Sequence, residues 1–71
     1  MKAEMLKASD IIKDPEIIDK IEGRYQIIKD ISPTNLNQAI NIMARKGWKC
    51  VNITGGFSTI PNICALMEKP T

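Results

Sequence analysis

The chain has 71 residues and a mass of 7.9 kDa, which leaves room for one domain with a thin core, because a chain of this size buries only about 60% of the surface that it exposes when unfolded. Hydrophobic residues make up 44% and charged residues 25%, and the net charge is +2; this mixed composition is typical of a globular protein and argues against a disordered chain. No apolar run approaches the ~18 residues that cross a bilayer, and the first residues lack the apolar stretch of a signal peptide, so we expect no membrane partner and a cytoplasmic location.

We expect a single domain, 1–71, in which an N-terminal helical segment at 1–23 precedes a core at 24–69. An apolar stripe at helical spacing marks one side of a first helix: Met1, Met5, Ala8 and Ile12. Asp14 suits the N-cap of a second short helix, Pro15 its first position and Gly23 its exit. The segment should therefore be two short helices with a break at Pro15.

The core is predicted to contain three strands and one helix. Residues 25–31 form a strand that Ser32-Pro33 ends. A helix follows from Thr34 or Asn35 as cap to Gly47, with a buried stripe of Leu36, Ala39, Ile40 and Met43. Strands at 48–53 and 62–68 are joined by the turn-rich stretch 54–61 and should form a hairpin.

This order of elements predicts an α+β fold, with β-α-β-β behind the N-terminal helices. We expect a three-stranded antiparallel sheet in the order 1-3-2, packed on one amphipathic helix. Period-two alternation places apolar residues on both faces of that sheet, whereas one helix covers one face only. The second face must be covered by the N-terminal helices or by another molecule, so the chain is expected to bind a copy of itself.

The stretch 36–51 carries a weak resemblance to known proteins. Its helix closes as Met43-Ala44-Arg45-Lys46-Gly47-Trp48 after a strand that contains Tyr25, and in this it resembles a group of small β-α-β-β domains of unknown function. Many of those domains have an acidic residue where this chain has Lys49. The resemblance covers about 24–69 and implies the β-α-β-β fold and a small, oligomeric, non-enzymatic protein. It implies no site residues.

The densest basic cluster consists of Arg45, Lys46 and Lys49 around Trp48, a composition found on surfaces that bind single-stranded nucleic acid. The helix dipole gives an alternative reason for cations in a last helical turn, and a tryptophan that begins a strand usually packs into the core. We therefore interpret Gly47 and Trp48 as a structural junction, with a positive φ at Gly47. The three cations remain the candidate nucleic-acid site.

No residue is predicted to be catalytic, to bind a cofactor or to bind a metal. Histidine is absent, which removes the usual base of serine and cysteine triads and the commonest zinc ligand. The Gly-rich stretch 54–59 is predicted to be a hairpin loop rather than an anion site, and the acids at 14, 16, 19 and 22 a solvated helix face. Cys50 and Cys64 are expected to be buried, free and unreactive.

The sequence thus favours a non-catalytic interaction module that acts as a homodimer or a higher homo-oligomer. The alternative is a small nucleic-acid-binding protein that uses Arg45, Lys46 and Lys49. An enzyme ranks third. No cofactor is expected, and the expected partner is the chain itself.

Overall fold

The computed structural model describes residues 5–57 and 60–70. In chain order the elements of this part are β1 (Leu6–Lys7), α1 (Ala8–Lys13), a 3-10 helix η1 (Pro15–Lys20), β2 (Tyr25–Asp30), α2 (Pro33–Arg45), β3 (Lys49–Phe57) and β4 (Ile60–Glu68). The predicted α+β class is confirmed. None of the helices in the described ranges has the length and apolar character needed to span a bilayer.

Within the described residues the strands form one mixed sheet in the order β1-β2-β4-β3. Strand β4 pairs with both β2 and β3 in antiparallel fashion, so the predicted order of those strands is correct. The prediction of a purely antiparallel, three-stranded sheet is wrong, because the short β1 adds to the edge of β2 in parallel, with Leu6 opposite Ile28 and Lys7 opposite Lys29.

The first helix of the N-terminal segment begins later than predicted. The expected stripe starts at Met1, which lies outside the described residues, but the described helix begins only at Ala8 and buries Ile11 in preference to Ile12. Backbone pairing of residues 6 and 7 with the free edge of β2 takes precedence over their helical spacing. The second helix begins as predicted, because the Asp14 carboxylate accepts a hydrogen bond from the Glu16 N–H at 3.3 Å.

Helix α2 starts earlier than the sequence indicated. Its N-cap is Ser32, whose hydroxyl accepts a hydrogen bond from the Asn35 N–H at 3.3 Å, and Pro33 occupies the first helical position. Thr34 and Asn35 are therefore inside the helix, not caps. A proline at the first position is favourable, because its fixed φ suits a helix and its missing N–H would have no partner there.

At the other end of α2, Gly47 turns the chain into β3. Its φ is 95°, the left-handed conformation that the sequence predicts. The Gly47 N–H donates to the Ala44 carbonyl at 2.9 Å and the Trp48 N–H to the Met43 carbonyl at 3.0 Å, which is the Schellman arrangement. Trp48 is only 6% exposed, and the Lys69 ammonium lies 5.9 Å from the centre of its ring.

Replacing Gly47 with alanine should lower the free energy of unfolding by about 1 kcal/mol, because an L-residue is strained at this φ. The added Cβ would also lie 3.1 Å from a side-chain carbon of Pro70. We expect the melting temperature to fall by about 4–8 °C. The matched control is Gly55→Ala, where the nearest atom is 3.8 Å away and φ is not positive. Equal melting temperatures for the two variants would contradict the left-handed conformation assigned to Gly47.

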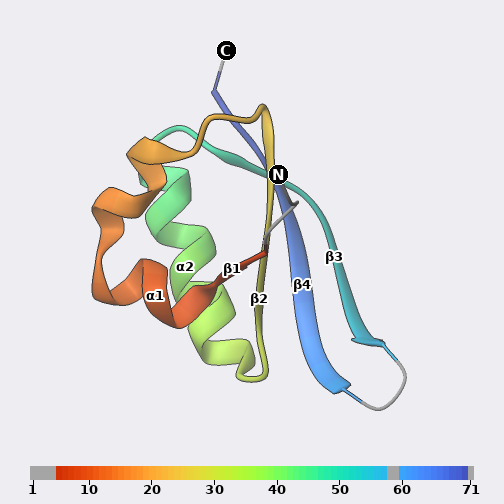
Figure 1. The fold of residues 1–71 in the computed structure, drawn as a ribbon. Coiled ribbons are helices and arrows are strands. Elements are labelled where there is room, and N and C mark those ends of the chain that lie inside the picture. The colour runs from red at the N-terminus through yellow and green to blue at the C-terminus, as the bar shows by residue number, and fades with distance from the viewer. Residues whose placement is uncertain (1–4, 58–59, 71) are drawn as a thin grey trace.

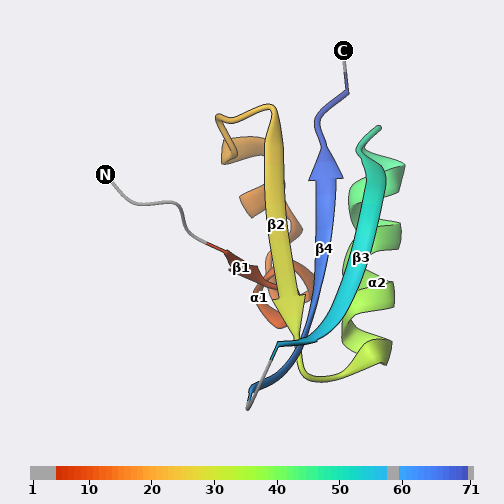
Figure 2. The same ribbon diagram turned by 90° about the vertical axis from the view of Figure 1, so that its right-hand side faces the viewer.

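All helices of the described residues lie on one side of the sheet (Figure 1). Seen from the other side, α1 and α2 lie behind the strands, and no helix or strand of residues 5–57 and 60–70 covers the near face of the sheet (Figure 2). The buried core lies between these layers and includes residues from every helix: Ala8, Ile11, Ile18, Ile28, Leu36, Ala39, Met43, Trp48, Ala65 and Met67. The N-terminal helices therefore cover the same face as α2 and leave the second face open.

Candidate functional site

The three cations of the predicted nucleic-acid site lie at the end of α2 and at the start of β3. Arg45 ends α2, and the Lys46 ammonium lies 3.1 Å from the Asp19 carboxylate of η1, so both belong to the helical layer. Lys49 is paired in register with Glu68 on β4. Trp48 is buried between these positions and offers no ring on which a base could stack.

The other candidate is the uncovered face of the sheet, which we call the open face. Ile28, Ala65 and Met67 are fully buried under the helices, so alternate residues of β2 and β4 point to the opposite side. Residues that are paired across neighbouring strands lie on the same face, so the strand pairs also assign the residues of β1 and β3 to the two faces. The apolar residues of the open face are Met5, Tyr25, Ile27, Cys64 and Leu66.

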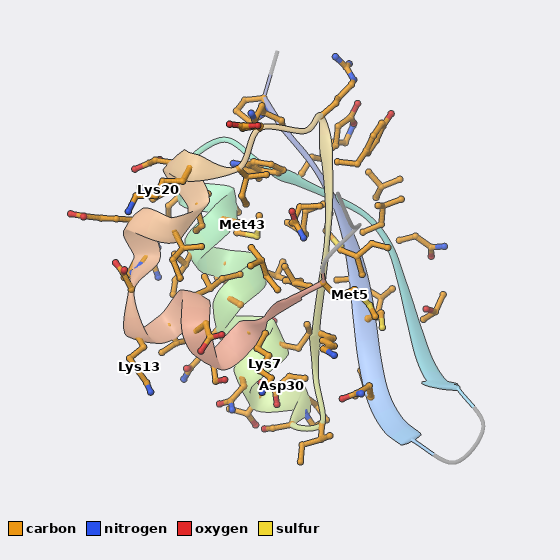
Figure 3. The ribbon with its side chains drawn as sticks, in the orientation of Figure 1. Met5, Lys7, Lys13, Lys20, Asp30 and Met43 are labelled. Carbon is orange, nitrogen blue, oxygen red and sulfur yellow. The ribbon has the colours of Figure 1, made fainter. Side chains whose placement is uncertain are left out.

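These apolar side chains are substantially exposed. Tyr25 is 50%, Met5 47% and Ile27 41% exposed, and Leu66 is half-buried. Figure 3 shows Met43 between α2 and the sheet, and Met5 on the other side of the sheet. The open face is thus a contiguous apolar surface in the middle of the sheet rather than scattered single residues.

A hollow of about 170 Å³ lies in the open face. Its walls come from β2, β3, β4 and the residue before β1, and they are nearly all apolar; the lining residues are Met5, Ile27, Asn52, Thr54, Cys64, Ala65 and Leu66. The position of Asn52 depends on a register shift between Cys50 and Asn52, which places it opposite Leu66. Such a hollow offers an apolar floor with two polar side chains at the β3 side, suited to the side chain of a partner.

Charged residues flank the open face at both ends. Lys7 and Lys29 are directly opposed at one end. At the other end Glu68 is paired in register with Lys49 and lies 3.3 Å from the Arg24 guanidinium. The apolar middle is therefore bordered by polar groups, as in protein interfaces with an apolar core and a polar rim.

The two cysteines are free and lie on opposite faces of the sheet. Cys50 is opposite the buried Met67, whereas Cys64 is opposite Lys29 and Thr54 on the open face. Both are free, as expected, but both are half-buried, so the expectation that they are buried is wrong. Their position on opposite faces separates the two thiols.

The remaining predicted features carry no site. Strand β3 continues through Phe57, so most of the stretch expected to be a hairpin loop is strand, and 58–59 lie outside the described residues. Among the residues that the structure describes, His, Cys, Asp and Glu form no group of three that could hold a metal. The acids of α1 and η1 are exposed, as expected of a solvated helix face.

Comparisons with family models, with curated proteins and with solved structures find no match to this chain. The resemblance to small β-α-β-β domains therefore stays an expectation. The candidate site depends on the geometry of the open face alone.

Proposed function

We propose that this protein is a non-catalytic interaction module that associates with a second copy of itself through the open face. One observation carries the proposal: the N-terminal helices pack beside α2, so they do not cover the apolar surface around Ile27 and Leu66. Apolar surface that is contiguous and exposed in this way is typical of an interface. The lack of histidine in the sequence supports a role without catalysis.

The size of the molecule also favours a partner. Its accessible surface is 4886 Å², and a stable interface buries about 800 Å² on each partner. An interface of that size takes about a sixth of the total. A domain with so thin a core gains stability when it buries more apolar surface. Free thiols such as Cys50 and Cys64 are typical of cytoplasmic proteins, the location that we propose.

The wild-type protein is expected to be a dimer at micromolar concentration in light scattering coupled to gel filtration. Ile27→Lys should make it a monomer, because the substitution places a charge in the middle of the apolar surface, where an unpaired charge is costly to bury. Folding should be retained, since Ile27 is already 41% exposed.

The matched control is Ile53→Lys. Ile53 is 54% exposed but lies opposite Ala65, on the helical side of the sheet, so this variant should stay dimeric. A monomeric wild-type protein would overturn the proposal, as would a dimer that Ile27→Lys leaves unchanged while circular dichroism shows both variants folded.

A further inference from the structure

We infer that the two copies exchange an aromatic anchor: the ring of Tyr25 from each copy enters the hollow on the open face of the other. This inference rests on the self-association proposed above and specifies how the two surfaces fit. It is carried by the volume of the hollow, by the exposure of Tyr25 and by the position of Ile27, which forms the β2 wall of the hollow two residues from Tyr25.

The hollow has the volume of one aromatic ring. A protein cavity of about 150 Å³ lined by apolar side chains holds a benzene molecule, and the hollow, which is open to solvent on one side, measures about 170 Å³. Its lining comes from Met5, Ile27 and Leu66 together with smaller side chains. Thr54 and Asn52 at the β3 side provide polar atoms near which a phenol hydroxyl can lie.

Tyr25 is the aromatic side chain available to fill the hollow. Of the aromatic side chains that the structure describes, Trp48 is buried in the core and Tyr25 is 50% exposed on the open face. Tyr25 does not line the hollow of its own chain. Tyrosines are enriched among the interface residues that contribute most to binding, because they supply a large rigid surface.

The spacing along β2 permits a reciprocal exchange. Tyr25 and Ile27 lie on the same face and are separated by two residues, about 7 Å along the strand. A two-fold axis across the strands, midway between Tyr25 and the hollow, places each ring in the hollow of the other copy. The contact is then isologous and closes as a dimer.

An axis across the strands also keeps the Lys7 and Lys29 ends of the two copies apart. It reverses the strand direction, so this end faces the end of the second copy that holds Arg24, Lys49 and Glu68. An axis along the strands would instead bring the four ammonium groups of Lys7 and Lys29 from both copies together. Like charges placed opposite one another are unfavourable.

The first test compares Tyr25→Ala with Ile53→Ala, which removes a similarly exposed side chain from the other face. Tyr25→Ala should raise the dimer dissociation constant by about 30-fold or more, as expected of an anchor residue. Ile53→Ala should leave the dissociation constant within about twofold of that of the wild type. Tyr25→Phe should retain most of the affinity, since it keeps the ring.

The second test uses complementation. Cys64→Phe fills the hollow but keeps the anchor, whereas Tyr25→Ala keeps the hollow and lacks the anchor. Each variant alone should be monomeric at concentrations at which the wild type is dimeric, and an equimolar mixture should form a heterodimer with one complete contact. Thr54→Phe, at an exposed position on the wall of the hollow, replaces Cys64→Phe if that variant fails to fold.

The outcomes separate this inference from the proposed function. A monomeric wild-type protein overturns both. A wild-type dimer that Tyr25→Ala leaves unchanged, or a mixture that associates no better than its components, overturns the exchange of anchors and leaves the interaction through the open face standing.

Discussion

Replacing Trp48 with alanine is expected to unfold the protein. The Trp48 side chain is 6% exposed and packs in the core beside the exit of α2, with Lys69 over its ring. Truncating a buried tryptophan costs about 3–5 kcal/mol, which is the whole stability that a core of this size usually provides. A far-UV circular dichroism melt of Trp48→Ala should therefore show no cooperative transition.

The control for Trp48→Ala is Trp48→Phe, which keeps an aromatic ring in the core and should remain folded with a reduced melting temperature. The alternative function makes the opposite prediction. If Trp48 bound nucleic acid together with Arg45, Lys46 and Lys49, Trp48→Ala would melt like the wild type and lose only its salt-dependent mobility shift on oligonucleotides. A thermally unchanged Trp48→Ala would contradict the structural role.

Ile18→Ala should destabilise the protein by about 2–5 kcal/mol, the usual cost of truncating a fully buried isoleucine. Ile18 lies in η1, is 1% exposed and packs in the same core as α2. The expected result is a large fall in the urea midpoint with little change in the slope of the transition.

Ile17→Ala is the matched control for this variant, since the neighbouring Ile17 is only half-buried. Truncating it removes fewer contacts, so its urea midpoint should fall much less. Small and equal effects at both positions would show that residues 15–20 are not part of the core. The second helix of the N-terminal segment would then contribute little to the stability of the domain.

The elements with strong local signals could be predicted from the sequence. The stripe of Leu36, Ala39 and Met43 identified α2, and Gly47 marked its exit, because side-chain periodicity and a left-handed C-terminal residue are local properties. The N-cap at Ser32 also had a local signal, since Pro33 suits a first helical position, but the Ser-Pro pair equally suits the end of a strand.

Strand β1 could not be predicted in the same way. Its two residues carry no periodicity of their own, and they are extended because the edge of β2 offers them backbone partners. Met5 reaches the open face for that reason. In these two residues, backbone pairing with a neighbouring strand determines the conformation, and intrinsic secondary-structure propensity does not, as is common in short segments.

The candidate site was predictable only in outline. Alternation in β2 and β4 placed apolar residues on both sheet faces, so an uncovered face could be anticipated. Which face the N-terminal helices would cover depends on how they pack against α2, and periodicity does not determine that packing. The hollow depends further on the register shift next to Asn52, which no local pattern in β3 reveals.

The sheet order has a consequence for how the chain acquires its structure during synthesis. Strand β4 is the last strand in the described chain, yet it lies between β2 and β3, which do not pair with each other. The earlier strands therefore emerge from the ribosome before their shared neighbour exists, and the hairpin of β3 and β4, whose partners are close in sequence, is the pairing with the lowest cost of loop closure. The part of the core that β4 contributes, Ala65 and Met67, is added only after residues 60–68 have been made.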